Sequence, residues 1–310
     1  MEPDLLIVAP EVADALRTGR PVVALESTLI SHGLPYPQNL EVARASEAAV
    51  REAGAIPATV AIRDGRLRVG LDAAALEALA TAPAGSIRKV ARPTLAAGLV
   101  AGGWAATTVS ATMIAAHAAG IGVFATGGIG GVHRGALRGP GAPTLDISSD
   151  LEELARTPVA VVCAGPKAVL DIPLTLEYLE TRGVPVLAIG QSDLPGFYSR
   201  SSGIRAPASV ATIEEAAPVV AAHRAIGGAG VLVCTPVPED EALAEDEARE
   251  AVERAVRDAA DAGIGGPDLT PWLLSRIAEL TDGRSVRANR ALIIHDAREA
   301  GRLGVELTRT

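Results

Sequence analysis

Lysine is rare in this chain, and one lysine stands where a nucleophile would be useful. Among 28 basic residues only Lys89 and Lys167 are lysine, and Lys167 closely follows the apolar run PVAVVC of residues 158–163. Such a lysine can reach solvent, hold a phosphate, or lose its proton in an apolar site and form a Schiff base with a carbonyl carbon. Because guanidinium does not deprotonate in proteins, arginine cannot take the last role. The scarcity of lysine therefore favours that role for at least one of the pair.

Two other apolar runs also end in reactive side chains. Glu26 ends the run PVVALE of residues 21–26, and Thr126 follows the run IGVFA of residues 121–125. Ligands of open α/β sheets bind beyond the carboxyl ends of the strands, and a glutamate at such an end is costly unless it is paired or functional. Together with Lys167, these residues predict a site at one edge of a sheet.

A glycine-rich segment, GGIGGVHRG, follows Thr126. It does not fit the dinucleotide pattern G-x-G-x-x-G, and it lacks the Gly-Lys-Ser/Thr of a P-loop. Two interpretations stay open. The segment is either an irregular loop whose glycines supply positive φ angles, or an anion site in which backbone N–H groups, Thr126 and His133 hold a phosphate.

The segment TLDISSDLEEL, residues 144–154, places carboxylates on both sides of two serines. Ser148 or Ser149 is predicted to cap a helix, with Asp150 complementing the helix dipole. Asp146 precedes the cap and suits a hard cation such as Mg²⁺ or Mn²⁺ held largely through water. Zinc is disfavoured, because no His or Cys lies nearby at the spacing of zinc ligands.

The composition disfavours several classes of protein. The 310 residues carry a formal net charge of −9, whereas nucleic-acid binding needs a basic face. The N-terminus lacks the features of a signal peptide, and Cys163 and Cys234 are expected to be reduced core residues of a cytoplasmic protein. Residues 93–133 carry no charged side chain, but their glycines and a break at Gly120 indicate a buried helix followed by a buried strand. No membrane span is predicted.

Short apolar strands alternate with helices along the chain, and Asp64-Gly65 predicts a hairpin within residues 58–71. This alternation predicts a single α/β domain over residues 1–310 with a largely parallel sheet. The predicted strands are residues 21–26, 121–125, 158–163, 184–190 and 229–238, and the predicted helices are 39–55, 106–120, 240–262 and two C-terminal helices separated by TDGRS.

Several longer motifs resemble one known family. The segments VVALESTLISHGLPYPQN, VFATGGIGGVHRG, LDISSDLEEL, VVCAGPKAVLDIPLTLEYLE and TPWLLSRIAELT are similar to those of pseudouridine-5′-phosphate glycosidases, from about residue 8 to about residue 300. The resemblance implies a three-layer α/β/α enzyme that forms a homotrimer and uses one Mn²⁺ per subunit. It also implies the reversible cleavage of the C–C bond between C5 of uracil and C1′ of ribose 5-phosphate.

The resemblance also implies roles for individual residues. Lys167 corresponds to the lysine that forms an imine with C1′, Glu26 to the acid that protonates the ring oxygen, and Asp146 to the residue at the metal. Asp150 is a candidate for proton transfer at the base and also belongs to the substrate-binding segment. The other expected substrate contacts are Lys89, Thr126 and His133 on the phosphate side, Val109, Ser148, Ser149 and, at the base, Asn289.

The residue types suit this chemistry. A C-glycosidic bond has no leaving-group oxygen to protonate, so hydrolysis by two carboxylates is a poor route. An imine at C1′ supplies an electron sink instead, which requires an amine, an acid for the ring oxygen and a proton donor or acceptor at C5.

Two departures from the family keep alternatives open. The segment RGALRGPGAPTL between His133 and Asp146 is longer than expected, and His295-Asp296 replaces an expected Asn-Asn pair. One alternative is an enzyme of the same fold that makes or cleaves a C-glycoside of another base or aromatic acceptor. Another is a non-catalytic sugar-phosphate-binding protein, which the presence of both Lys167 and Glu26 disfavours.

Overall fold

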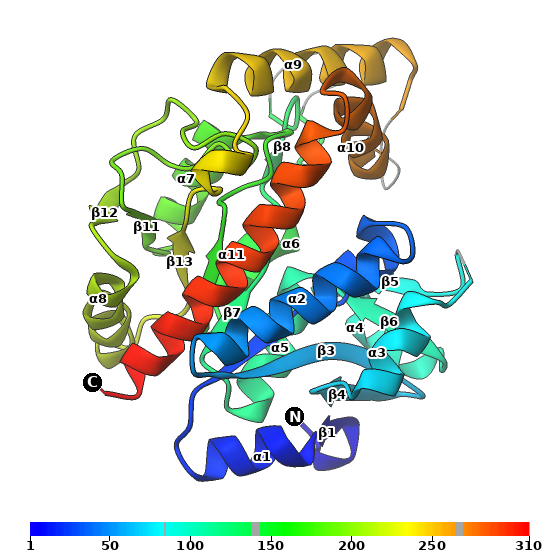
Figure 1. Cartoon of the computed structure of the whole chain (residues 1–310), viewed down its shortest axis with the longest axis vertical. Helices are drawn as coiled ribbons and strands as arrows, with labels where there is room; N and C mark the ends of the chain where they lie inside the picture. Colours follow the sequence, from blue (N-terminus) through cyan, green and yellow to red (C-terminus); the bar gives the residue numbers. More distant parts are fainter. Residues whose placement is uncertain (84, 138–142, 265–268, 310) are drawn as a thin grey trace.

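The computed structural model describes residues 1–309 except 84, 138–142 and 265–268. These residues form a central sheet of 11 strands in the order β1-β4-β3-β2-β7-β9-β13-β11-β12, with β6 beside β3 and β5 beside β6. Helices cover both faces of the sheet (Figure 1). The strands are β1 (Leu6–Val8), β2 (Val22–Leu25), β3 (Ile56–Arg63), β4 (Arg66–Val69), β5 (Arg88–Val90), β6 (Trp104–Thr107), β7 (Val123–Ala125), β9 (Ala160–Cys163), β11 (Val186–Ile189), β12 (Ala208–Val210) and β13 (Val231–Cys234).

Most neighbouring strands of this sheet run parallel, as predicted. The exceptions are β3 with β4 and β3 with β6. The β3–β4 hairpin turns at Asp64 and Gly65, whose φ angles are 51° and 79°. A two-residue turn with positive φ at both positions matches the right-handed twist of the paired strands. The predicted hairpin is therefore confirmed.

The helices form a layer on each face of the sheet, which confirms the three-layer α/β/α prediction. Apolar side chains of α2, α8 and α11 pack on one face, and those of α1, α5, α6 and α7 pack on the other. The helices are α1 (Pro10–Arg17), α2 (Gln38–Glu52), α3 (Ala73–Ala80), α4 (Leu95–Val100), α5 (Val109–Ala119), α6 (Ser149–Leu154), α7 (Ile172–Thr181), α8 (Ile213–Ala225), α9 (Glu245–Asp261), α10 (Leu269–Leu280) and α11 (Arg284–Leu307).

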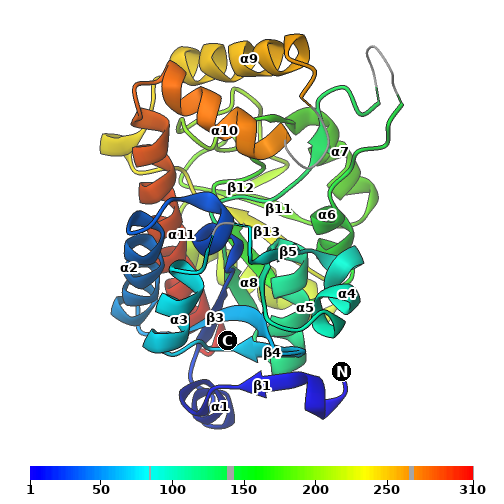
Figure 2. The same ribbon diagram turned by 90° about the vertical axis from the view of Figure 1, so that its right-hand side faces the viewer.

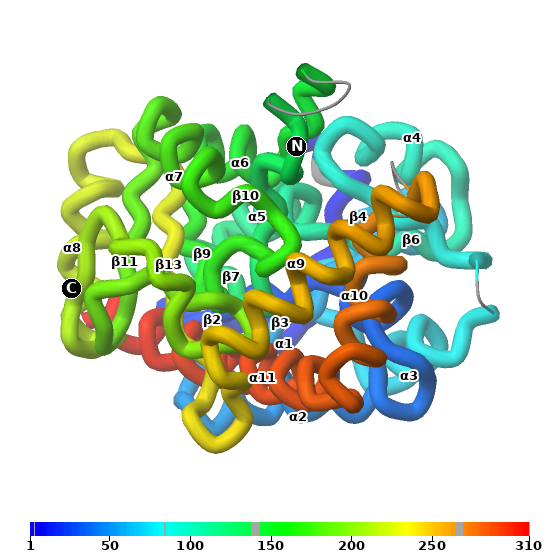
Figure 3. Tube along the Cα trace, turned by 90° about the horizontal axis from the view of Figure 1, so that it is seen from above, coloured from blue at the N-terminus to red at the C-terminus, as the bar shows by residue number. Residues whose placement is uncertain are grey.

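Helices α9 and α10 lie outside these layers and cross the end of the sheet (Figures 2 and 3). Their apolar side chains join the N-terminal part of α11 and residues that follow strand ends, such as Ala164 and Phe197, in one buried cluster. A small antiparallel pair, β8 (Val132–His133) and β10 (Leu170–Asp171), lies at the same end. The carboxyl ends of the central strands are therefore covered rather than open.

Two predicted helices begin too early. The helix predicted over residues 240–262 starts at Glu245, after a separate 3₁₀ turn at Glu239–Glu241. The other is the helix predicted over residues 106–120. Residues 106 and 107 belong to β6, and α5 starts at Val109. The hydroxyl of Thr107 donates to Val60 O at 2.9 Å, and β6 pairs with both β3 and β5. These tertiary partners override the helical pattern of the sequence. The uncharged stretch 93–133 is likewise more than a helix and a strand, since it contains α4, β6, α5, β7 and β8.

The two cysteines are buried and unpaired, as expected for reduced core residues. They lie opposite one another on the neighbouring parallel strands β9 and β13. Within the described part of the chain, no helix is both long enough and apolar enough to cross a membrane.

Candidate active site

Three adjacent parallel strands bring the predicted residues to one edge of the sheet. Strand β7 pairs with β2 on one side and with β9 on the other. Glu26 follows β2, Thr126 follows β7, and Lys167 lies four residues beyond the end of β9. Because all three strands point the same way, their carboxyl ends meet at one place, as the sequence predicted.

A cavity of about 360 Å³ lies at this edge. Residues that follow the strands form one side of it, and Thr270, Pro271 and Leu274 of α10 contribute to another. Five of the predicted site residues line the cavity together: Glu26, Lys89, Thr126, Lys167 and Asn289.

Glu26 has the surroundings of a proton donor. The Thr126 hydroxyl donates to its Oε1. Burial raises the pKa of the Glu26 carboxyl, and the Lys167 charge and the Thr126 hydrogen bond oppose that rise. A carboxyl with a raised pKa stays protonated closer to neutral pH, which is what general acid catalysis requires.

Lys89 lies on β5 and shares the cavity with Lys167. Burial lowers the pKa of Lys89, and the neighbouring charge of Lys167 lowers it further. Glu26 and Asp150 act in the opposite direction. Two cations so close together favour an anionic ligand, because its charge would relieve their mutual repulsion.

A tight turn holds Lys167 at the edge of the cavity. Gly165 has a left-handed φ of 85°, and its N–H donates to Cys163 Sγ at 3.3 Å. The N–H of Lys167 donates to Ile129 O at 3.1 Å. The backbone on both sides of the lysine is therefore fixed, by the end of β9 and by the glycine-rich segment.

The glycines of that segment divide into two groups. Gly135 has a φ of 82°, as the positive-φ interpretation predicts. Gly127, Gly128, Gly130 and Gly131 have no positive φ, so that interpretation is wrong for these four. They allow close packing instead. A Cβ at Gly128 would lie 2.9 Å from Gly165 O, and one at Gly130 would lie 2.3 Å from Ser148 Oγ.

Asp150 is buried and does not line the cavity, and its carboxylate accepts two backbone hydrogen bonds. Its Oδ1 accepts the N–H of Ser110 at 3.0 Å, and its Oδ2 accepts the N–H of Gly130 at 2.9 Å. The predicted helix cap is Ser148, whose Oγ accepts the N–H of Asp150 at 3.2 Å. Asp150 is close enough to influence both Glu26 and Lys89 electrostatically.

The remaining predicted contacts of this region surround Asp150 and do not line the cavity. Ser149 Oγ lies 3.2 Å from Ser110 Oγ, and Val109, the first residue of α5, is buried beside them. Hydrogen bonds thus join Ser148, Ser149 and Asp150 with Ser110, and Val109 precedes Ser110 in the chain.

His133 and Asp146 form a separate pair. His133 Nδ1 lies 3.7 Å from Asp146 Oδ2, and the N–H of His133 donates to Asp146 O at 3.0 Å. Among the residues that the structure describes, no three His, Cys, Asp or Glu side chains gather as a metal site. This donor set fits a hydrated hard cation with one protein carboxylate, and it does not fit a site with three protein ligands. Part of the long segment between them, residues 138–142, lies outside the described residues.

His32 and Phe197 are among the cavity residues to which the sequence assigned no role. His32 lies on the short π-helical turn η2 (Leu29–Gly33) after β2, and its Nδ1 is 2.7 Å from Ser31 Oγ. Burial, and then the charge of Lys89, lowers the pKa of His32. Phe197 lies in the loop after β11. The one sequence signal available for it was the scarcity of phenylalanine, with two in the chain, and no prediction was based on it.

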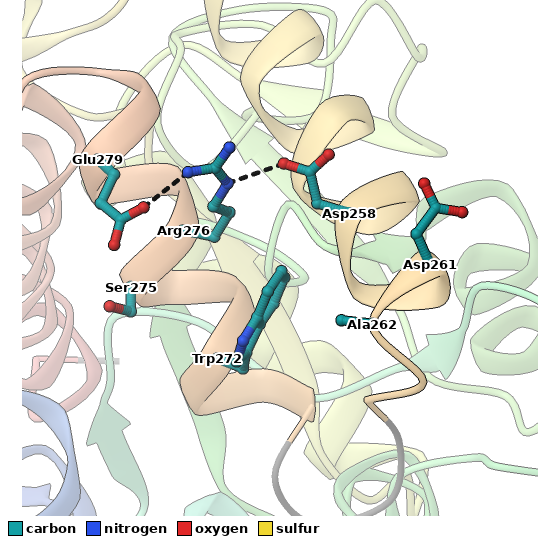
Figure 4. Close-up of a pocket in the computed structure, with 7 residues that line it drawn as sticks. All are labelled: Asp258, Asp261, Ala262, Trp272, Ser275, Arg276 and Glu279. Atoms are coloured by element: carbon teal, nitrogen blue, oxygen red, sulfur yellow. Dashed lines mark hydrogen bonds and ion pairs between the residues drawn. The ribbon is translucent and has the colours of Figure 1, made fainter.

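A second, outer cleft lies between α9 and α10 (Figure 4). Its volume is about 560 Å³, and Trp272 and Arg276 lie along it. The Arg276 guanidinium is already engaged by Asp258 at 2.8 Å and by Glu279 at 2.7 Å. None of the predicted site residues lines this cleft, so it is not the candidate site.

Neither residue of the His295-Asp296 departure lines the cavity. Asp296 is fully buried, the Thr235 hydroxyl donates to its Oδ1, and its Oδ2 has no hydrogen-bond partner among the described residues. Burial raises the pKa of the Asp296 carboxyl well above its usual range, and Cys163 and Glu299 add to the rise. A protonated carboxyl has both an acceptor oxygen and a donor group, as the amide of asparagine does.

We therefore expect Asp296→Asn to stabilise the protein increasingly as the pH rises. The folded state keeps a proton that the unfolded state releases above about pH 4, so wild-type stability falls by about 1.4 kcal/mol per pH unit between the unfolded and folded pKa of Asp296. The stability of Asp296→Asn should not fall in this way, because its amide does not titrate. Urea unfolding of both proteins from pH 5 to pH 9 measures the difference, and Glu306→Gln on the same helix is the control. Parallel stability curves for wild type and Asp296→Asn would contradict a protonated Asp296.

Comparisons with known proteins agree on one family. The model of the family described as Indigoidine synthase A like protein matches residues 11–306. A pseudouridine-5′-phosphate glycosidase of Paracoccus denitrificans is 53% identical over 98% of this chain and 99% of its own length. One from Sorangium cellulosum is 52% identical over 98% of this chain and 94% of its own.

Two solved structures share the fold over nearly the whole chain. The prealnumycin C-glycosynthase, in complex with ribulose 5-phosphate, has a TM-score of 0.89 at 38% identity and covers 98% of this chain and 97% of its own. An indigoidine synthase A-like protein of Thermotoga maritima has a TM-score of 0.85 at 31% identity, with the same coverage.

Proposed function

The chain belongs to the indigoidine synthase A-like family that includes the pseudouridine-5′-phosphate glycosidases, and we propose that it reversibly cleaves pseudouridine 5′-phosphate to uracil and ribose 5-phosphate. The observation that carries the proposal is the shared cavity of Lys167, Glu26 and Lys89. These side chains supply an amine, a carboxyl with a raised pKa and a second cation. The names of close, full-length relatives support the same reaction.

The proposed reaction begins at the ribose ring. Glu26 gives its proton to the ring oxygen O4′ as the C1′–O4′ bond breaks, and Nζ of Lys167 forms a bond to C1′. The new C1′–NH2⁺ group then passes a proton to the Glu26 carboxylate, and the freed nitrogen lone pair forms a C1′–N double bond as the C1′–C5 bond breaks and C5 of uracil takes up a proton. Water finally releases ribose 5-phosphate from the imine and restores the lysine. The amine lone pair thus expels C5 of uracil, for which a C-glycoside offers no glycosidic oxygen to protonate.

Asp150 is the proposed group for the proton at C5. Its two backbone N–H donors fix the orientation of the carboxylate beside the cavity. Its electrostatic influence on the Glu26 carboxyl supports this role. A carboxylate held in this way can pass a proton directly or through one water.

The experiment that tests the function is incubation of the purified protein with pseudouridine 5′-phosphate and Mn²⁺. Chromatography should detect uracil and ribose 5-phosphate in equal amounts, and the reverse mixture should regenerate the nucleotide. Absence of both products would contradict the proposal.

Lys89 is proposed to hold the 5′-phosphate. We expect Lys89→Ala to raise KM for pseudouridine 5′-phosphate about 10- to 100-fold, the effect of losing a hydrogen bond between charged groups. Turnover of unphosphorylated pseudouridine should change little. Arg88→Ala is the control, because it removes a positive charge from the next residue of β5, where the side chain bonds Gly102 O instead. Equal effects of Lys89→Ala on both substrates would contradict the phosphate role.

A divalent cation is proposed at Asp146, held mainly through water beside His133. When bound, Mn²⁺ would supply positive charge next to the proposed substrate contacts Ser148, Ser149 and Asp150. We expect EDTA to abolish turnover and Mn²⁺ to restore it. The activity of Asp146→Ala should not increase when Mn²⁺ is added, and this variant should not deplete free Mn²⁺ in an electron paramagnetic resonance titration. Asp240→Ala, at an exposed acid, is the control. Full activity after exhaustive chelation would remove the cation from the reaction.

Two further proposals concern assembly and substrate. A homotrimer is proposed from the family resemblance, and light scattering coupled to size exclusion would report a different mass if the proposal is wrong.

The second candidate function is the synthesis or cleavage of another C-glycoside, which the likeness to the prealnumycin C-glycosynthase favours. Formation of a C-glycoside from ribose 5-phosphate and an aromatic acceptor, without formation of one from uracil, would support this second function.

A further inference from the structure

Phe197 lies in the cavity with a strained backbone. Its φ of 69° is in the left-handed region, which bulky side chains rarely adopt. Residues in such regions persist only when the surrounding structure fixes them, and they cluster at functional sites. Phe197 is 3% exposed and lines the cavity.

Close contacts fix the position of the Phe197 ring. A Cβ at Gly128 would lie 2.6 Å from Phe197 Cε2, so the glycine-rich segment packs directly on the ring. The ring of Tyr198 lies edge-on at 4.9 Å between centroids. The loop itself is held by hydrogen bonds from Gly196 N to Ser199 O at 3.1 Å and from Leu243 N to Tyr198 O at 2.9 Å. The ring is therefore held rigidly before any ligand binds.

The lining of the cavity has two chemically different parts. Glu26, Lys89 and Lys167 influence one another electrostatically and form a charged part. Phe197 and Ile293 belong to one buried apolar cluster, against which Leu29 and Leu274 pack, and these side chains form an apolar part. Asn289 adds an amide to the lining.

This division matches the two halves of the proposed substrate. A sugar phosphate needs cations and an acid, whereas a planar base needs an aromatic or apolar surface and a few hydrogen-bonding groups at its edge. A preformed ring provides contact area with little loss of conformational entropy. Asn289 can donate and accept at the edge of a pyrimidine.

We propose that Phe197 is a specificity-determining residue whose ring packs against the planar nucleobase, while the charged part of the cavity holds the sugar phosphate. The proposal rests on the proposed function. It predicts that the ring matters for the base and not for the covalent capture of ribose 5-phosphate alone.

The test separates the two halves of the reaction. Phe197→Leu and Phe197→Ala should raise KM for uracil in the synthetic direction roughly 10-fold or more, the effect of losing a base-stacking ring. Both should still trap ribose 5-phosphate on Lys167 with borohydride in the absence of uracil. Phe197→Tyr, which keeps the ring, should retain uracil affinity.

The matched control is Phe124→Leu, the same replacement at the other phenylalanine. Phe124 is fully buried in the cluster on the α5 face of the sheet and does not line the cavity. It should lower stability without changing KM for uracil. If Phe197→Ala fails to fold, Phe197→Leu decides.

Failure of the inference and failure of the proposed function give different results. An unchanged KM for uracil in Phe197→Leu, or an equal loss of trapping and uracil affinity, would overturn the role of Phe197. Wild-type protein that traps ribose 5-phosphate but does not use uracil would overturn the proposed base, and with it this inference. Wild-type protein that neither traps nor cleaves would overturn the proposed function itself.

Discussion

Lys167→Arg is expected to lose turnover of pseudouridine 5′-phosphate by at least about 1,000-fold, since removal of a covalent nucleophile has effects of this size or larger. The substitution keeps the positive charge in the cavity. It removes the one capability that a Schiff base needs, because guanidinium does not deprotonate in proteins. The KM for the substrate should change much less than kcat.

The chain offers a matched control for this substitution in its other lysine. Lys89→Arg makes the same change in the same cavity, but a phosphate-binding cation can be arginine. It should keep activity within about tenfold of wild type. If the two variants lost activity equally, or if Lys167→Arg kept a near-normal rate, Lys167 would not be the nucleophile.

Glu26→Gln is expected to lower kcat by about 100- to 10,000-fold, the usual contribution of a positioned general acid. The amide oxygen can still accept the Thr126 hydroxyl, so the geometry of this contact is kept. Because burial raises the pKa of Glu26, wild-type kcat should fall as the pH rises through that pKa. The residual activity of Glu26→Gln should lack this fall.

Glu47→Gln is the control for the acid. Burial also raises the pKa of Glu47, and the Thr59 hydroxyl donates to its carboxylate at 2.5 Å. Glu47 does not line the cavity, although Thr59 does. It should keep the wild-type rate and pH profile. A pH profile that Glu26→Gln left unchanged would show that another group donates the proton.

The sequence predicted the candidate site best where reactive side chains follow the ends of predicted strands. Glu26, Thr126 and Lys167 each follow an apolar run, and the parallel order β2-β7-β9 brings them together. This outcome needs only the rule that ligands bind at the carboxyl ends of parallel strands. The hairpin at Asp64-Gly65 was predictable for a similar reason, because its turn chemistry is local.

Features that depend on tertiary contacts were not predictable in this way. The pattern at residues 106–120 is helical, and β6 exists because β3 and β5 flank it. The glycines before His133 were interpreted through positive φ angles or as an anion site, and neither interpretation anticipated their close approach to Phe197, Ser148 and Thr175. His32 lies on a turn and Phe197 in a loop, and both line the cavity. The hydrophobic periodicity of the sequence does not predict where such irregular segments lie.

The most direct test of the mechanism is reduction of the imine during turnover. Borohydride added to protein with ribose 5-phosphate and uracil should inactivate it, and mass spectrometry should find one reduced sugar-phosphate adduct on the peptide that contains Lys167. Lys167→Arg should give no adduct, and Lys89→Arg should still give it. An adduct on Lys89 instead, or full turnover without any trapped lysine, would contradict a Schiff base at Lys167.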